Sequence, residues 1–213
     1  MADIQVKICG LTTPDAVKSA VEHGADYLGF VFYRPSPRYI EPKKAAKLVA
    51  KVPRQIKKVA VIVDMNMDEL SKVVRAFRPD YLQLHGQETE QDIERIQKKF
   101  TIPIIKAIKI RSSDDVAKGL RYAAVSDMLL FDAKAPEALL PGGNGLAFDW
   151  TLLKARKIEL PWFLSGGLNL QNIKDALYIT HAPMVDLSSS LERAPGVKDP
   201  QLIELFLKKV KSA

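Results

Sequence analysis

Cysteine is nearly absent from this chain: Cys9 is the only one in 213 residues. A lone thiol cannot form a disulfide within the chain, so the fold has no covalent cross-link, and we expect the thiol to stay reduced in a cytoplasmic protein. Apolar runs of about 18 residues, the length that crosses a bilayer, are also missing. The opening segment MADIQVKICG carries charges before any apolar block, unlike a secretory signal. The sequence therefore excludes a disulfide-rich secreted protein and predicts no membrane partner.

The charge balance is positive, with 32 lysines and arginines against 25 aspartates and glutamates. Such an excess suits an anionic partner, either nucleic acid or a small phosphorylated or carboxylated ligand. Most lysines, however, are spaced among apolar residues in stretches such as EPKKAAKLVAKV and DIERIQKKF, as on solvated helix faces. No aromatic residues are interleaved with them for base stacking. We therefore expect a small anionic ligand and no nucleic acid.

Short β-branched segments alternate with longer amphipathic segments along the whole chain. Eight segments have the character of strands, and each is followed by a helical pattern that begins at a capping or helix-starting residue. Eight βα units in roughly 200 residues fit a closed barrel better than a doubly wound sheet. We predict an α/β fold, a single (β/α)8 TIM barrel over residues 1–213, with strands at 4–8, 27–31, 58–63, 81–84, 104–108, 128–131, 162–164 and 184–187.

Polar residues stand at the carboxyl ends of these strands, which in (β/α)8 barrels meet at one mouth and carry the active site. Cys9 closes the first strand, and Lys7 points to the same side and could stabilise a thiolate. The alternative is a small cysteine that only packs. The other polar residues at strand ends are Asp64, His85, Lys106, Asp132, Ser165 and Asp186.

Asp132 follows the apolar segment DMLLF, three strands from Cys9 around the predicted ring. Two inward side chains in these places could flank a pair of sugar carbons, which suits an acid on one side of a substrate and a base on the other. A helix cap or a structural ion pair is the alternative for Asp132. His85, in QLHGQE, either acts in the site or is a strand-end histidine with its hydrogen bonds satisfied.

Two adjacent loops give the strongest local signal. LSGGLN follows the seventh strand and DLSSSLE the eighth, and loops in these places commonly bind phosphate through glycine N–H groups, hydroxyls and a short helix. Glycine or serine pairs are usually only turns, so their joint placement carries the argument. The predicted phosphate ligands are Gly166, Gly167, Ser188 and Ser189.

Two further loops are candidates for substrate contacts. In RPSPRYI, after the second strand, two prolines stiffen the backbone around Arg38, whose guanidinium could bind a carboxylate through two parallel hydrogen bonds. PGGNGLAFDW lies in a long loop after Asp132. Long loops in compact domains often act as lids, so we predict a lid that includes Gly142, Gly143 and Gly145.

Seven segments together resemble the phosphoribosylanthranilate isomerases, the (β/α)8 barrels of tryptophan biosynthesis. In chain order they are KICGLT, SPRYI, LQLHGQE, FDAK, GGNGLAFDW, LSGGLNLQN and VDLSSSLERAPGVKD, which span essentially the whole chain. The resemblance implies an Amadori rearrangement of N-(5-phosphoribosyl)anthranilate to 1-(2-carboxyphenylamino)-1-deoxyribulose 5-phosphate. It also implies that the reaction needs no cofactor and no metal.

The resemblance assigns roles to the candidate residues. It makes Cys9 the general base that removes the C2 proton and Asp132 the general acid that protonates the furanose ring oxygen. It makes Arg38 the ligand of the anthranilate carboxylate and the two glycine and serine loops the phosphate site. We expect His85 and Asp186 to contact the substrate as well.

This chain departs from the family pattern in two places. Ser190 stands where the family usually has glycine, and a non-glycine residue there costs roughly 1 kcal/mol if the backbone φ is positive. Asn144 replaces the threonine often seen in GGTG, within the predicted lid.

Two other functions remain open from the sequence. A Schiff-base aldolase would use Lys106 as its nucleophile, and borohydride reduction with substrate would then label that lysine. A catalytically silent barrel that binds phosphate or nucleic acid would show steeply salt-dependent binding to DNA or RNA and no turnover. For the isomerase we expect a monomer or a homodimer.

Overall fold

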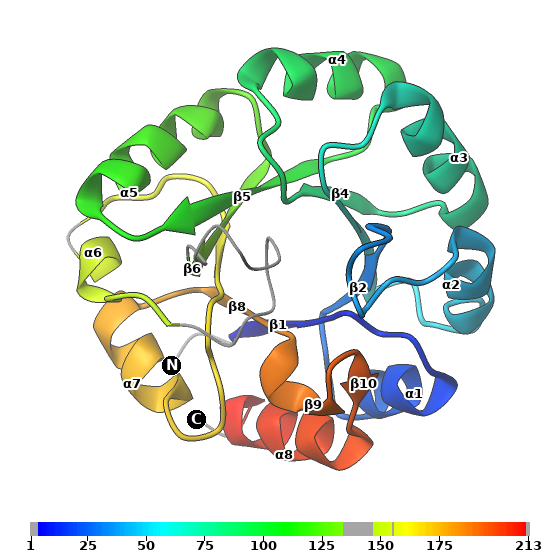
Figure 1. Cartoon of the computed structure of the whole chain (residues 1–213). Coiled ribbons are helices and arrows are strands. Elements are labelled where there is room, and N and C mark those ends of the chain that lie inside the picture. The colour runs from blue at the N-terminus through cyan, green and yellow to red at the C-terminus, as the bar shows by residue number, and fades with distance from the viewer. Residues whose placement is uncertain (1–3, 134–146, 155, 212–213) are drawn as a thin grey trace.

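The computed structural model describes residues 4–133, 147–154 and 156–211, in which eight parallel strands close into a barrel (Figure 1). β8 pairs with β1, so the ring has no open edge, and the predicted (β/α)8 fold is confirmed. The barrel strands are β1 (Gln5–Cys9), β2 (Tyr27–Val31), β3 (Lys57–Ile62), β4 (Tyr81–Leu84), β5 (Ile104–Ile110), β6 (Met128–Ala133), β7 (Trp162–Leu164) and β8 (Met184–Leu187). Both β5 and β6 end two residues beyond the predicted bounds.

A helix follows every strand, and the helices form the outer ring in Figure 1. Local sequence determines where several of them begin: the Thr13 hydroxyl caps α1, and Thr89 and Ser112 start α4 and α5 with capping boxes. The helices are α1 (Pro14–Glu22), α2 (Pro42–Leu48), α3 (Met67–Phe77), α4 (Glu90–Phe100), α5 (Ser113–Leu120) with the 3-10 helix η1 (Arg121–Ala124), α6 (Thr151–Lys154), α7 (Ile173–Thr180) and α8 (Pro200–Lys211).

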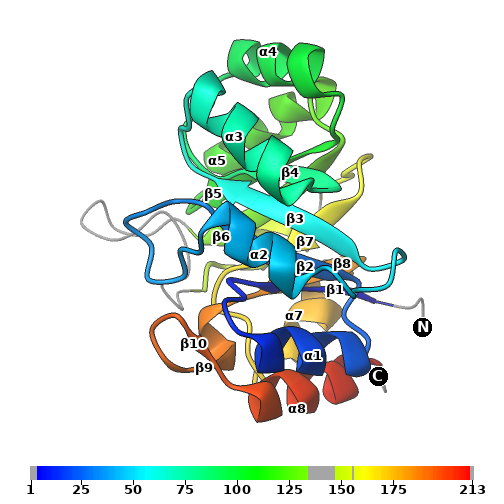
Figure 2. The same cartoon turned by 90° about the vertical axis from the view of Figure 1, so that its right-hand side faces the viewer.

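A small hairpin between β8 and α8 was not predicted from the sequence. The chain leaves β8 through the 3-10 helix η2 (Ser189–Leu191) and then forms the antiparallel strands β9 (Glu192–Ala194) and β10 (Val197–Lys198). Strands of three and two residues are too short to show a period-two pattern. In Figure 2 this hairpin lies at the same end of the barrel as the loop that follows β2.

The apolar core has two layers, one inside the barrel and one between the strands and the helices. Because side chains alternate along a strand, the layer to which a residue belongs shows which way it faces. Cys9 belongs to the inner layer, so its thiol faces the barrel interior. The other inner residues are Tyr27, Val31, Val59, Val61, Ile105, Ala107, Leu130, Phe163 and Met184.

Three aspartates at the opposite end of the barrel tie neighbouring strands together. Each stands immediately before β2, β4 or β6, and its carboxylate accepts a hydrogen bond from a backbone N–H of the strand before it. Because the three sites repeat the same geometry, these three pairs of strands are joined in the same way. The hydrogen bonds are Val6 N to Asp26, Lys58 N to Asp80 and Ile104 N to Asp127, each at 2.7 Å.

Removing one of these carboxylates is expected to destabilise the barrel without changing the arrangement of the residues at its mouth. Asp26→Ala leaves the N–H of Val6, a fully buried residue, without this acceptor, which should lower the free energy of unfolding by about 1–3 kcal/mol. Urea denaturation measures the loss. Glu94→Ala, at an exposed position on α4, is the matched control and should stay within about 0.5 kcal/mol of wild type. Equal losses in the two variants would contradict the structural role of Asp26.

Candidate active site

Cys9 is the last residue of β1 and is 7% exposed at the mouth of the barrel. Its neighbour across the β1–β2 pair is Gly29, where an ideal Cβ would lie 3.0 Å from Cys9 Sγ and 3.2 Å from Lys7 Cε. The absence of a side chain at position 29 therefore leaves room for both inward groups of β1. As predicted, the thiol and the ammonium lie on the same face of the strand.

Lys7 is fully buried beneath Cys9 and donates to Asp186 Oδ1 at 2.8 Å. The second carboxylate oxygen of Asp186 accepts from the Ser165 hydroxyl at 3.3 Å. Burial by itself lowers the pKa of Lys7, but Asp186 and Cys9 outweigh it, so the pKa lies above its ordinary value. The ammonium therefore stays charged next to the thiol.

The thiol itself is held mainly in its neutral form. Burial raises the pKa of Cys9 above its ordinary value, Lys7 opposes this, Asp186 adds to it, and Lys198 opposes it more weakly. Only a small fraction of Cys9 is therefore thiolate at neutral pH, and that fraction grows as the pH rises. Any reaction that needs the thiolate should therefore become faster as the pH rises.

Lys7→Met is expected to move the alkaline rise in activity to higher pH. Methionine is unbranched like lysine and one atom shorter. It removes the cation that lowers the pKa of Cys9 and leaves the Asp186 charge that raises it. At pH 7 we expect kcat/KM to fall by about tenfold or more. The pH profile of kcat/KM checks this, with Lys18→Met on the exposed face of α1 as the control. A profile that superimposes on that of wild type would contradict the role of Lys7.

Asp132 lies within β6, on the same face as the inward residue Leu130, and is buried. Its Oδ1 accepts from the backbone N–H of Ala133 at 2.9 Å, and its Oδ2 lies 3.3 Å from His85 Nε2. On its other side an ideal Cβ at Gly166 would lie 3.2 Å from Asp132 Oδ1. The carboxyl group therefore stands between the end of β4 and the loop after β7.

His85 is oriented from below by a second barrel residue, Gln83. The amide Nε2 of Gln83 lies 2.9 Å from His85 Nδ1 inside the barrel, where Gln83 is 1% exposed. This contact holds the imidazole so that its Nε2 faces Asp132. The prediction that His85 lies at the mouth is confirmed, and Gln83 is an orienting residue that the sequence reasoning missed.

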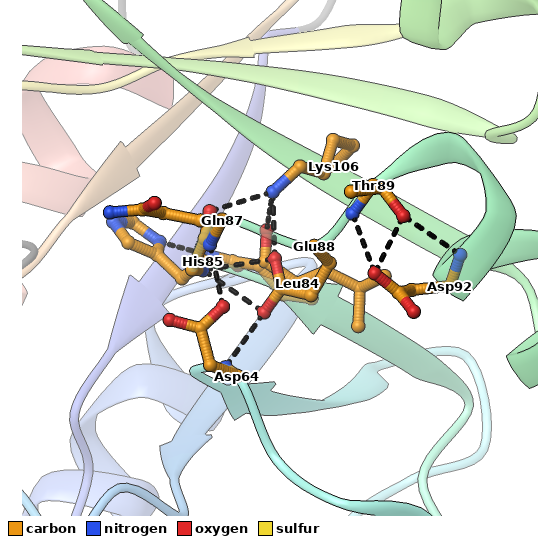
Figure 3. Close-up of polar contacts among 10 residues, drawn as sticks. Asp64, Leu84, His85, Gln87, Glu88, Thr89, Asp92 and Lys106 are labelled. Atoms are coloured by element: carbon orange, nitrogen blue, oxygen red, sulfur yellow. Dashed lines mark hydrogen bonds and ion pairs between the residues drawn. The ribbon is translucent and has the colours of Figure 1, made fainter.

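The structure corrects the prediction for Lys106. β5 continues to Ile110, and because Ile105 and Ala107 face inward, Lys106 points outward toward the helices. Its ammonium donates to Glu88 Oε2 at 2.7 Å and to the carbonyl oxygens of Leu84 and Gly86 (Figure 3). Lys106 therefore does not face the interior of the barrel, where Cys9 and Asp132 lie, and the aldolase interpretation loses its nucleophile.

The same contacts build the loop that carries His85 (Figure 3). Glu88 accepts from the N–H groups of Asp64 and Gly86 at 2.9 and 3.0 Å, and Asp64 Oδ1 accepts from Gln87 N at 2.6 Å. Asp64 is exposed and has φ +45°, so it serves the loop rather than the site. Asp64 and Lys106, two of the polar residues predicted at the strand ends, therefore support the loop that carries His85 and do not line the candidate active site.

The two predicted phosphate loops lie next to each other and beside Cys9 and Asp132. Gly166 and Gly167 both have positive φ, and Asn172 Nδ2 donates to Gly167 O at 2.9 Å. Across the β1–β8 junction, the Ser188 hydroxyl donates to Cys9 O at 3.2 Å. The loop after β8 is therefore bonded directly to the end of β1.

Ser190 carries none of the strain that a positive φ would bring. It lies in η2 and is not among the described non-glycine residues with positive φ. The conditional cost stated for this departure from the family pattern therefore does not apply. Its hydroxyl is buried and makes no hydrogen bond within the described part of the chain.

Arg38 is buried at the mouth, where its stem passes over Gly10, the residue after Cys9; an ideal Cβ at Gly10 would lie 2.8 Å from Arg38 Cδ. Its guanidinium donates from Nε and Nη2 to the two carboxylate oxygens of Glu192, both at 2.8 Å. Lys198, from β10, pairs with the same carboxylate. Glu192 and Lys198 were not predicted, because the two strands of the hairpin that carries them are too short to show a sequence pattern.

Three of the predicted residues cannot be placed. Gly142, Gly143 and Gly145, with Asn144 between them, lie outside the described residues. Within residues 4–133, 147–154 and 156–211, no three His, Cys, Asp or Glu side chains are grouped so that they could hold a metal ion. No helix in those same ranges has the length and apolar character needed to cross a membrane.

A closed (β/α)8 barrel with polar residues at the carboxyl ends of its strands, and with glycine and serine loops after β7 and β8, is typical of barrel enzymes that bind phosphorylated ligands. Residues 6–209 match the family model described as N-(5'phosphoribosyl)anthranilate (PRA) isomerase. The chain belongs to this family, and the predicted isomerase function is confirmed.

Relatives and solved structures agree with the family. An N-(5'-phosphoribosyl)anthranilate isomerase of Parvibaculum lavamentivorans is 47% identical, and the alignment covers 99% of each chain. The crystal structure of the isomerase from Thermotoga maritima is 34% identical, with a TM-score of 0.88 over 99% of this chain and 100% of that one. A further isomerase structure, in complex with reduced 1-(o-carboxyphenylamino)-1-deoxyribulose 5-phosphate, is 33% identical, with a TM-score of 0.86 and the same coverage.

Proposed function

We propose that Cys9 and Asp132 carry out the isomerisation of phosphoribosylanthranilate as general base and general acid. One observation carries the proposal: the two side chains, on β1 and β6, both face the interior at the mouth of the barrel. Neighbouring residues link them. Lys7, beneath Cys9, binds Asp186, and Asp186 binds Ser165. Gly166, which follows Ser165, lies against Asp132.

The first step opens the sugar ring. The Asp132 carboxylic acid gives its proton to the furanose oxygen, the bond from C1 to that oxygen breaks, and its electron pair stays on the oxygen. The anthranilate nitrogen donates its lone pair to C1, which gives a protonated Schiff base. This cation makes the neighbouring hydrogen on C2 acidic enough for a thiolate to remove.

The second step moves the double bond, and the third restores the enzyme. Cys9 thiolate takes the C2 proton, and the electrons of that C–H bond form the C1–C2 double bond of an enolamine while the nitrogen becomes neutral. The C2 hydroxyl then gives its proton to the Asp132 carboxylate as C1 receives the proton held by Cys9. Both groups return to their starting states, and no redox cofactor is consumed.

The remaining predicted residues hold the two ends of the substrate. Arg38 binds the anthranilate carboxylate, and the loops of Gly166, Gly167, Ser188 and Ser189 bind the phosphate. His85 and Asp186 contact the sugar between these ends. The structural neighbour with a reduced carboxyphenylaminodeoxyribulose phosphate bound supports a ligand of this chemistry. A monomeric or homodimeric state and a cytoplasmic location stay predictions.

A direct assay tests the proposed reaction. The purified protein should consume phosphoribosylanthranilate, seen as loss of the substrate's fluorescence above the rate without protein. The product should be the deoxyribulose phosphate rather than free anthranilate, which chromatography distinguishes. Steeply salt-dependent DNA binding with no consumption of substrate would favour the silent barrel instead.

A further inference from the structure

We propose that Glu192, in the hairpin after β8, is a positioning residue that presets the guanidinium of Arg38 for the substrate. Through Lys198 it also fixes the distance between the carboxylate-binding and phosphate-binding ends of the site. The inference rests on the proposed function, because the binding role of Arg38 is part of it. Glu192 itself does not touch the reacting atoms.

The contact between Glu192 and Arg38 determines the plane of the guanidinium. The Glu192 side chain is only 4% exposed, and its two oxygens accept from Nε and Nη2 of Arg38, both at 2.8 Å. A bidentate pair of this kind fixes rotation as well as position, because the five N–H donors of arginine lie in one rigid plane. The guanidinium held in this plane is the group that the proposed function assigns to the anthranilate carboxylate.

Glu192 remains ionised despite its burial. Burial raises the pKa of Glu192, but hydrogen bonds from Arg38 and Lys198 outweigh this, and the pKa lies below its ordinary value. A backbone donor, the N–H of Gly196, adds a further bond at 3.1 Å. The carboxylate is therefore a permanent anchor for Arg38 over the ordinary range of pH.

The same carboxylate reaches the phosphate loop through Lys198. The Lys198 ammonium donates to Glu192 Oε1, to Ser188 O at 3.1 Å and to the Ser188 hydroxyl at 3.4 Å. Ser188 is bonded in turn to Cys9 O. A continuous chain of polar contacts thus runs from Arg38 to the predicted phosphate ligand and on to the end of β1.

The backbone of the hairpin packs against the loop after β2, which carries Arg38. This packing holds the Glu192 carboxylate in place. Gly196, at the hairpin turn, has φ +81°, and a Cβ there would collide with the carbonyl of Pro37, next to Arg38. The hydroxyl of Thr12 contacts Gly196 O at 3.4 Å. Figure 2 shows the hairpin and the loop after β2 together at one end of the barrel.

Glu192→Gln tests the inference. Glutamine keeps the shape but can accept from only one of the two Arg38 donors and turns an amide NH2 toward a cation. We expect KM for phosphoribosylanthranilate to rise by about tenfold or more while kcat changes by less than about threefold. If Glu192 acts through Arg38, then adding Glu192→Gln to Arg38→Met should lower kcat/KM by no more than about twofold beyond Arg38→Met alone.

Asp26→Ala is the matched control, because it loses stability at the far end of the barrel and should keep wild-type KM and kcat. An unchanged KM in Glu192→Gln, or effects that simply multiply in the double variant, would overturn the inference.

If Glu192→Gln does not fold, Glu192→Met with Lys198→Met replaces the buried ion pair by apolar groups and gives the same comparison. If neither folds, Glu192 is purely structural and the inference fails. No turnover by wild type would instead refute the proposed function, and an unchanged KM in Arg38→Met would refute the role of Arg38.

Discussion

Cys9→Ser should lower kcat for phosphoribosylanthranilate by about 10²–10⁴-fold while the barrel stays folded, because the loss of a general base has an effect of this size. A hydroxyl is far less acidic than a thiol, so the variant cannot supply the anion that removes the C2 proton. The substitution is nearly isosteric and keeps Lys7, Asp186 and Gly29 in place around position 9. Fluorescence kinetics and thermal unfolding together separate lost chemistry from lost structure.

Alkylation gives an independent check, because Cys9 is the only cysteine in the chain. One iodoacetamide label per chain should abolish turnover, and Cys9→Ser should take up no label. Product bound in the site should slow the labelling, since the thiol would then lie beneath the sugar. Full activity in Cys9→Ser, or in the labelled protein, would remove the thiol from the mechanism.

Asp132→Asn should lower kcat by a comparable factor, about 10²–10⁴-fold, through a different step. An asparagine amide has the size of the carboxyl group but cannot give a proton to the departing ring oxygen. The contacts made by Arg38 and by the phosphate loops should persist, so the affinity for a product analogue should change only slightly. Asp114→Asn, at an exposed position at the start of α5, is the control and should behave as wild type.

Deuterium at C2 of the substrate distinguishes the two roles. Cys9→Ser slows the step that breaks the C2–H bond, so its isotope effect on kcat/KM should be fully expressed. Asp132→Asn slows ring opening, which comes earlier, so its isotope effect should fall toward one. Equal isotope effects in the two variants would mean that Asp132 does not act at ring opening.

Much of the fold could be predicted because its signals are local. Strands buried on both faces appear as short apolar runs between turns, and β2, β4, β7 and β8 have the predicted bounds. The positions of Cys9 and Asp132 at the mouth could be predicted for the same reason, since each is a polar residue at the carboxyl end of such a run. Lys7 could also be assigned to the face of Cys9, because residues two apart on a strand share a face.

Lys106 shows where local reasoning failed. The segment IIKAI is a strand in both the prediction and the structure, but β5 continues to Ile110, and the register of the closed ring turns Lys106 outward. A shift of one residue in a strand exchanges its inner and outer faces. The apolar residues on both sides of Lys106 are equally buried, so the pattern could not indicate which face was which.

The number and order of the βα units, and the residue types near the ends of the strands, could be predicted without the structure, because they depend on contacts between near neighbours. Which charged side chains meet depends on how the barrel closes. Arg38 pairs with Glu192 across 154 positions and Lys7 with Asp186 across 179. Closing the ring pairs β8 with β1 and so places Asp186 beside Lys7. It also brings the loop after β2 and the hairpin after β8 to the two sides of β1, where Arg38 meets Glu192, and no local sequence pattern contains this geometry.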